Sequence, residues 1–195
     1  MIGRASFGRL FLIRYFCCMR RIAKARPEDI PQLLKLVNSA YRGEEAKKGW
    51  THEADLIDGT VRIDERSLYE MILKNGAVIL KCTDEDSLVG SVYLEKQGEE
   101  LYLGMLSVLP HLQGSGIGKE LLMAADTHAR EVGCRTITMN VISVREELIE
   151  WYSKYGYRKT DLRKPFPDDA RFGKPTQPLE FAVLKKEIQP LDTIL

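Results

Sequence analysis

The feature that most constrains the fold of this chain is a glycine-rich loop placed between a strand and a helix. Residues 101–108 form an aliphatic run of strand length, and residues 116–132 carry apolar residues at helical spacing. The loop between them has glycine at three alternate positions, Gly114, Gly116 and Gly118. Alternate glycines let the backbone turn tightly and present several N–H groups in one direction, and the positive end of the following helix favours an anion. The sequence therefore predicts an anion cradle suited to a pyrophosphate.

Two common nucleotide-binding loops do not fit these residues. A Walker loop needs glycine where Gln113 stands and serine or threonine where Glu120 stands. A Rossmann fingerprint needs a small residue in place of Lys119, and it should follow the first strand of a parallel unit. Both alternatives are therefore set aside.

The rest of the chain predicts a single α/β domain around this loop. Apolar spacing and turn residues first indicate a strand at 21–25, helices from Pro27 and at 67–74, and strands at 77–82, 88–95 and 101–108. After the helix that follows the loop, they indicate a strand at 136–142, a helix at 146–155 and a final strand or two, one of them at 179–184. The three central strands are joined by short loops, so we expect an antiparallel meander. The expected architecture is a mixed central sheet of six to seven strands flanked by about four helices. Residues 42–66 read as a polar, turn-rich connector, and a proline-containing loop precedes the last strand.

Charge divides the chain into unlike parts. The whole sequence has 29 Lys and Arg against 28 Asp and Glu, which removes the bulk electrostatic case for a nucleic-acid binder. Residues 1–26 contain seven basic residues and no acidic ones, so the remainder carries 22 basic and 28 acidic residues. We expect a leader at 1–19, the α/β domain at 20–187 and a short tail at 188–195. Two interpretations of the leader stay open. It is a tail or the product of a start codon placed too early, which implies a cytoplasmic protein, or it is an amphipathic mitochondrial targeting segment.

Other classes of site and partner find little support. No stretch approaches the roughly 18–20 apolar residues of a membrane span. The cysteines and histidines show no spacing typical of zinc ligands, so no metal is expected. The sequence leaves a homodimer open.

The loop and a later segment together resemble a known family. The segment 113–118, with sequence Gln-Gly-Ser-Gly-Ile-Gly, is similar to the acetyl-CoA pyrophosphate loop of the GNAT (Gcn5-related) N-acetyltransferases. The segment 151–157, with sequence Trp-Tyr-Ser-Lys-Tyr-Gly-Tyr, is similar to a late motif of the same family. The resemblance covers roughly residues 20–187, including the order of the strands.

The resemblance implies acetyl-CoA as cosubstrate and a set of residues that bind it. Pantetheine would lie along the strand at Leu106, Ser107 and Val108. The pyrophosphate would be held by the loop residues Gln113, Gly114, Ser115, Gly116, Ile117, Gly118 and Lys119. A primary amine would attack the thioester directly, and Tyr152 matches the family tyrosine that protonates the leaving thiolate. A phenol with a pKa near ~10 stays neutral at pH 7 and can act as that acid.

The residues that would bind the amine and remove its proton are less determined, because the general base varies within the family. Glu100 is our candidate general base, with Glu95, His52, Glu53 and Asp55 as further candidates. Candidate acceptor-binding residues in and beside the connector are Tyr41, Arg42, Trp50 and Glu53. The family often has Asn where this chain has Arg145. That arginine either contacts a phosphate or an acidic acceptor, or lies on the solvated first turn of a helix.

Three functions remain open from the sequence. The first is an N-acetyltransferase that acts on the primary amine of a small molecule. The second is acetylation of a protein N-terminus or lysine, which needs an open groove and would be disfavoured by a pocket closed by the connector. The third is a non-catalytic acyl-CoA-binding module, against which the presence of Tyr152 argues.

Overall fold

The computed structural model describes residues 20–167, 169, 171 and 173–189. The expected leader at 1–19 and residues 190–195 of the expected tail lie outside this range. The elements follow one another as β1 (Arg21–Lys24), η1 (Pro27–Asp29), α1 (Ile30–Tyr41), α2 (Gly43–Ala46), β2 (Ile57–Asp58), α3 (Glu65–Leu73), β3 (Ala77–Asp84), β4 (Ser87–Gln97), β5 (Glu100–Val108), η2 (Pro110–Leu112), α4 (Ile117–Glu131), β6 (Thr136–Ile142), α5 (Glu146–Ser153), β7 (Arg158–Pro165), β8 (Lys174–Pro175) and β9 (Glu180–Glu187).

Within the described residues, the central sheet is mixed and has seven strands in the order β1-β3-β4-β5-β6-β9-β7. Strands β3, β4 and β5 form the expected antiparallel meander. The pairing of β5 with β6 is parallel, and the outer pairs β6·β9 and β7·β9 are antiparallel. The predicted mixed α/β domain is confirmed.

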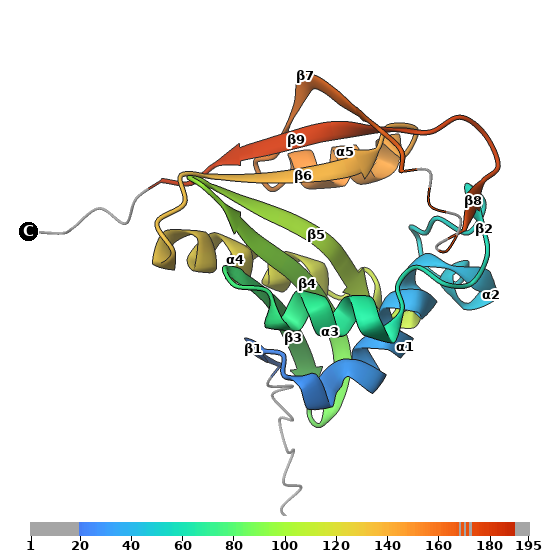
Figure 1. Ribbon diagram of the computed structural model, residues 1–195, viewed down its shortest axis with the longest axis horizontal. Coiled ribbons are helices and arrows are strands. Elements are labelled where there is room, and N and C mark those ends of the chain that lie inside the picture. The colour runs from blue at the N-terminus through green and yellow to red at the C-terminus, as the bar shows by residue number, and fades with distance from the viewer. Residues whose placement is uncertain (1–19, 168, 170, 172, 190–195) are drawn as a thin grey trace, which may run out of the picture.

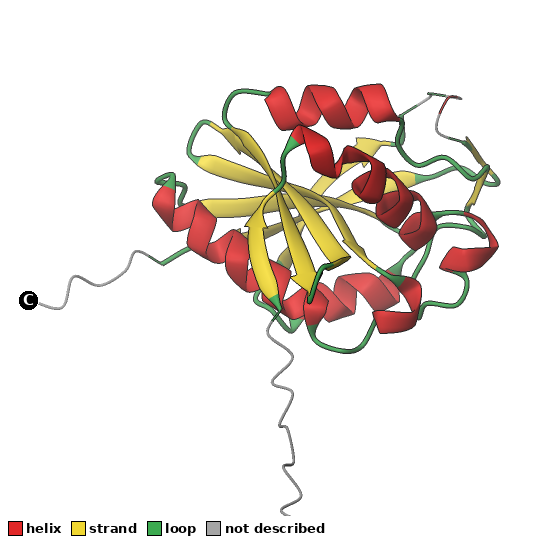
Figure 2. Cartoon of the chain, turned by 90° about the horizontal axis from the view of Figure 1, so that it is seen from below, coloured by secondary structure: helices red, strands yellow, loops and turns green. Residues whose placement is uncertain are grey.

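Helices cover both faces of this sheet. Figure 1 shows α1 and α3 in front of the sheet and α4 and α5 behind it, and Figure 2 gives the same layers from below. The alternation of side chains along the strands explains the two layers. On β3, Ile79 packs with the α1 residues Leu33 and Val37, whereas the next residue, Leu80, packs with the α4 cluster that includes Leu121.

The parallel pair at the centre of the sheet is joined at one end only. Strands β5 and β6 pair from Glu100 to Tyr102, opposite Thr136 to Thr138, and then separate (Figure 1). We call the divergence of these strands the fork. A bulge lies in the divergent part of β5, because Tyr93 faces Gly104 whereas Ser91 faces Ser107, which leaves one extra residue in β5.

The bulge is centred on Met105, whose φ of 47° lies in the left-handed region. A bulge bends its strand and increases its twist. The bulge lies where β5 has left β6 but is still paired with β4.

Strand β7 is the additional late strand that the sequence allowed for but did not locate. Seven of its eight residues are exposed, and it pairs along one side with β9 at the edge of the sheet. Because no face of β7 is buried, it shows no apolar alternation, and Pro165 falls at its end, as an edge strand allows.

Candidate functional site

Two adjacent pockets share part of their walls. The loop pocket lies among the glycine loop, the connector and α5; its own lining includes Trp50, Thr51, Val108, Gln113, Gly114, Gly116, Gly118, Lys119, Trp151 and Tyr155. The fork pocket lies between β5 and β6; its own lining includes Glu53, Arg62, Tyr102, Met105, Asn140 and Phe181. Both pockets are lined by Tyr41, Leu106, Arg145, Leu148 and Tyr152. A group bound in one pocket can therefore meet a group bound in the other at these shared residues.

The glycine loop has the backbone geometry that the sequence predicts. Gly114 and Gly116 have φ of 85° and 93°, and Gly116 is the N-cap of α4. A Cβ at Gly114 would find nothing within 4 Å, so the space beside that backbone is open. A bare backbone at the start of a helix is the arrangement that binds phosphate groups.

Two of the predicted loop residues do not face the pocket. Ile117 is 1 % exposed and belongs to the core under α4. The Ser115 hydroxyl donates to the Leu112 carbonyl at 2.7 Å, so that side chain stabilises the turn of the loop itself. On β5, Ser107 is also buried, and its hydroxyl donates to the Met105 carbonyl at 3.0 Å.

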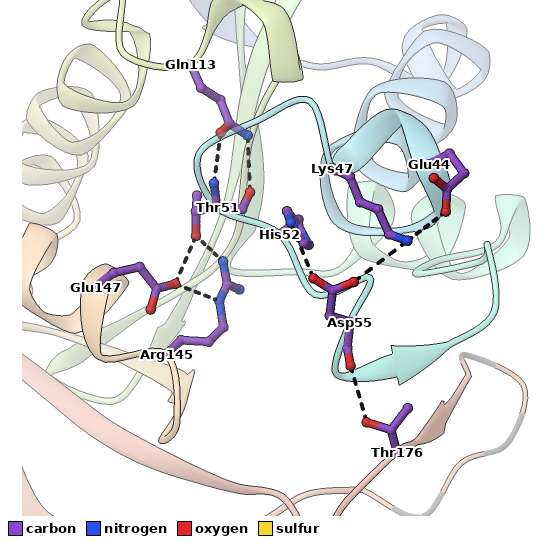
Figure 3. Close-up of polar contacts among 9 residues, drawn as sticks. All are labelled: Glu44, Lys47, Thr51, His52, Asp55, Gln113, Arg145, Glu147 and Thr176. Carbon is purple, nitrogen blue, oxygen red and sulfur yellow. Dashed lines mark hydrogen bonds and ion pairs between the residues drawn. The ribbon is translucent and has the colours of Figure 1, made fainter.

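The connector is fastened to the loop through Gln113. The Thr51 amide donates to the Gln113 side-chain oxygen, and the Gln113 amide nitrogen donates to the Thr51 carbonyl, each at 3.4 Å (Figure 3). Gly49 allows this approach, because a Cβ there would come within 2.5 Å of the Gln113 side chain. The connector thus forms one wall of the loop pocket.

Arg20 is a neighbour of the loop that sequence reasoning missed. Its guanidinium donates to the Ser115 carbonyl at 3.0 Å and to the Glu120 carboxylate at 2.8 Å. It therefore neutralises an acidic side chain in the first turn of the helix that is suited to bind an anion. No local pattern could reveal this contact, since Arg20 and Ser115 are 95 positions apart in the chain.

Tyr152 lies on α5 where the two pockets meet. Its side chain is 6 % exposed, and its ring packs edge-on against Trp151 and Tyr157, with centroids 5.0 and 5.7 Å apart. Burial raises the pKa of Tyr152 well above its ordinary value. The phenol is therefore held neutral, as a proton donor must be.

Tyr41 stands opposite Tyr152 in the shared wall. Its hydroxyl donates to the Leu106 carbonyl at 3.0 Å, which ties α1 to the bulged part of β5. Burial, with a smaller contribution from Glu53, raises the pKa of Tyr41 to about 12. Tyr41 thus holds the strand that borders both pockets.

Glu53 is the centre of a buried group of charges. Its carboxylate lies 2.6 Å from Arg42, 3.5 Å from Arg145 and 3.8 Å from Arg62. Arg42 was expected to contact the acceptor, but it is 4 % exposed and lines neither pocket. Its position behind Glu53 makes it a residue that fixes the carboxylate rather than one that touches a ligand.

Arg145 is not solvated, so that interpretation of it is wrong. It is 6 % exposed and caps the start of α5, with its guanidinium directed at Thr51 of the connector and 3.6 Å from Glu147 (Figure 3). It lines both pockets. The remaining interpretation, contact with a phosphate or an acidic acceptor, agrees with this position.

The other sequence candidates divide into those near the site and those away from it. Trp50 lines the loop pocket, 47 % exposed, with its ring centroid 6.2 Å from that of Trp151. Glu100 does not reach the site: it lies at the joined end of the fork, and its carboxylate is 2.5 Å from Lys185. It lines neither pocket, so we do not retain it as the base.

The remaining base candidates also lie outside the two pockets, apart from Glu53. His52 and Asp55 contact each other in the connector at 3.9 Å, and Asp55 also pairs with Lys47 (Figure 3). The Glu95 carboxylate accepts from the Tyr93 hydroxyl at 2.8 Å and lies 2.8 Å from Lys74. Neither arrangement puts a free base at the fork.

Comparison with known proteins identifies the family. Residues 51–167, which include the glycine loop, α5 and most of the connector, match the model of the acetyltransferase (GNAT) domain. The chain belongs to the GNAT family. Members of this family use acetyl-CoA. A mycothiol acetyltransferase from Rhodococcus erythropolis is 26 % identical over 138 residues, which are 67 % of this chain and 44 % of that protein. The chain thus matches less than half the length of that curated relative.

Solved GNAT structures share the fold. The ribosomal-protein-S18-alanine N-acetyltransferase of Escherichia coli superposes with a TM-score of 0.65 at 14 % identity, over 91 % of this chain and 99 % of that one. The PaiA N-acetyltransferase of Thermoplasma acidophilum, solved with coenzyme A, gives 0.64 at 18 % identity, over 87 % and 99 %. In the described part of this GNAT chain, no helix is long and apolar enough to cross a bilayer.

Proposed function

We propose that this chain transfers the acetyl group of acetyl-CoA to the primary amine of a small molecule, with Tyr152 as the general acid. The observation that supports this most strongly is the meeting of two pockets at Tyr152. The loop pocket has the backbone donors and the open glycines that a pyrophosphate needs, and the fork pocket offers separate space for an amine.

Each part of the site has a task in this reaction. Acetyl-CoA would supply the thioester that the amine attacks. Gly114 and Gly116, with the start of α4, would bind the pyrophosphate, and Leu106 and Val108 line the path from the loop to the fork. The Tyr152 hydroxyl, which its raised pKa keeps protonated at neutral pH, would give its proton to the departing sulfur.

The position of the connector favours a small acceptor over a protein. Residues of the connector line both pockets: Trp50 and Thr51 the loop pocket, and Glu53 and Arg62 the fork pocket. An extended peptide would need an open groove beside β5, where this segment stands. The named relatives include an enzyme for a ribosomal protein and one for mycothiol, so their names do not decide between the two classes.

The test is a panel of amines, monitored by release of the CoA thiol, with the Tyr152→Phe variant. We expect transfer by the unchanged protein and a fall of about 100-fold or more in kcat for the variant, with acetyl-CoA affinity retained. The control is Tyr69→Phe, since Tyr69 is 49 % exposed on α3 and lines neither pocket. Unchanged turnover in Tyr152→Phe would remove Tyr152 as the acid. Tight acetyl-CoA binding without transfer to any amine would favour the non-catalytic module.

A further inference from the structure

The fork pocket has more positive charge than its acidic groups can balance. In the described part of the chain, the charged residues that line the fork pocket are two arginines, Arg62 and Arg145, and one glutamate, Glu53. A pocket that only had to accept a cationic amine would be expected to present the opposite sign. The pocket therefore has a net charge of one positive unit, which a ligand of negative charge would balance.

We infer that the acceptor amine also carries a carboxylate, and that Arg62 and Arg145 bind it. The inference rests on the proposed function, because it names the class of molecule that enters the same site. A single surplus charge matches a carboxylate, which is a monoanion, and the guanidinium fork suits its two oxygens.

Arg62 is the arginine with donors to spare. In the described part of the chain its one ion pair is with Glu53, at 3.8 Å, and that carboxylate oxygen already has Arg42 at 2.6 Å. The Arg62 guanidinium lies 5.4 Å from the centre of the Tyr41 ring, so an aromatic face supports it from one side. Its backbone amide donates to the Asn38 side chain at 2.6 Å, which fixes the root of this side chain at the pocket.

Arg145 supplies the second group and brings it close to the reacting centre. Its side chain is 7 % exposed, and its Nε lies 3.6 Å from the Glu147 carboxylate without a hydrogen bond to any described residue. It lines both pockets beside Tyr152, so an acid bound there would hold its amine near the shared wall. Desolvation at this depth would make an ion pair with the ligand stronger than at the surface.

The same arrangement would also help the chemistry. An amine attacks only after it has lost its proton, and positive charges nearby disfavour its protonated form. Two guanidiniums would therefore hold the carboxylate and at the same time lower the pKa of the amine next to it. A surplus of arginine over glutamate side chains is therefore compatible with a site for an amine.

The test uses amines in pairs that differ only in the acid: L-phenylalanine with L-phenylalaninamide, L-methionine with L-methioninamide, and β-alanine with β-alaninamide. Transfer is followed by thiol release, and binding of each amine to the CoA-bound protein by titration calorimetry. We expect at least one acid to bind, and to react, about tenfold better than its amide or more. Arg62→Gln should reduce that preference by a similar factor, and Arg62→Lys should restore part of it.

The control is Arg66→Gln, because Arg66 is 88 % exposed on α3, pairs with Glu70 and lines neither pocket. It should leave the preference for the acid unchanged. If acids and amides react alike, or only amides react, the inference fails while the proposed function stands. If acids bind through Arg62 but no acetyl group is transferred, the inference holds and the proposed function fails. If no acid binds the CoA-bound protein, the inference is overturned.

Discussion

Two tyrosines, the partly buried Tyr41 and the buried Tyr152, line both pockets, and their environment sets their protonation. Burial is the largest cause of the raised pKa of each. For Tyr152 this keeps the proton that catalysis would use. For Tyr41 it keeps the hydrogen bond to the Leu106 carbonyl, which needs a hydroxyl that donates.

The raised pKa of Tyr41 predicts a loss of stability at high pH. A group whose pKa rises from 10.0 when unfolded to about 12 when folded stabilises the fold fully below pH 10 and progressively less as the pH approaches 12. Tyr41→Phe should lower the free energy of unfolding by about 1 kcal/mol at neutral pH, through the lost hydrogen bond, and should show a shallower loss above pH 10.

Urea denaturation at steps between neutral pH and pH 12 measures both effects. Tyr69→Phe is the matched control, since that ring is 49 % exposed and should follow the unchanged protein at every pH. An equally steep alkaline loss in Tyr41→Phe would show that Tyr41 does not contribute to it.

At the scale of elements, the glycine loop and α4 show how local sequence produces a binding geometry. Positive φ at Gly114 and Gly116 reverses the chain after η2, and the first turn of α4 then follows directly. Arg20, just before β1, holds the loop from outside through Ser115 and Glu120. The cradle therefore depends on both a local pattern and a distant contact.

Gly114→Ala should weaken binding of acetyl-CoA, and Gly98→Ala is its matched control. Both glycines have positive φ, 85° and 66°, and a Cβ at either would meet nothing within 4 Å, so each substitution has a similar conformational cost of about 1–2 kcal/mol. Only Gly114 lines the loop pocket, whereas Gly98 lies in the turn between β4 and β5. Thermal melts and calorimetric titration separate stability from affinity. An equal effect of both variants on affinity would argue against a cradle at Gly114.

The elements were predictable where one face is buried and not where none is. Helix α4 has apolar residues at helical spacing, and strands β3 to β6 are apolar runs of strand length, so their positions followed from the sequence. Strand β7 is exposed on almost every residue and is held by pairing with β9, which leaves no periodic signal. The connector contains the short elements α2 and β2. Their conformation depends on distant contacts, such as the pairing of β2 with β8, that the local sequence does not reveal.

Across the whole molecule, the fork divides the sheet into two parts, β1-β3-β4-β5 and β6-β9-β7. They share backbone pairing over Glu100–Tyr102 and are otherwise connected by packing under α4 and α5. A ligand that lies in the fork should therefore connect the two parts and stabilise the fold as a unit.

Saturating CoA should raise the melting temperature of the protein. At a concentration of about 100 times its dissociation constant, a ligand stabilises by about 2.7 kcal/mol. For a chain of this size that corresponds to a shift of about 5–10 °C. Differential scanning fluorimetry measures the shift, and hydrogen exchange should show increased protection in the divergent part of β5. Pantothenate, which lacks the pyrophosphate and the thiol, is the control ligand and should shift the melting temperature far less. A shift without protection in β5 would place CoA outside the fork.

Placement across the whole molecule explains which site residues could be found from the sequence. That Tyr152 and the glycine loop line one pocket could be predicted because their motifs are local; their roles in catalysis and binding stay predictions. Glu100 was misplaced because the sequence does not say which end of β5 faces the pockets. The burial of Arg42 and Arg145 depends on Glu53, a partner that the connector brings to them.

The bulge at Met105 also changes which side chains of β5 face α4. Leu101 and Leu103, before it, pack with the α4 cluster, and so do Leu106 and Val108, after it, so the inward positions change from odd to even numbers. Deleting one residue between Leu103 and Leu106 would restore simple alternation and leave Leu106 facing α4, but it would remove the bulge and with it the bend of β5 beside the fork. The length of this strand is thus part of the site: it can tolerate changes of side chain more readily than the loss of a single residue.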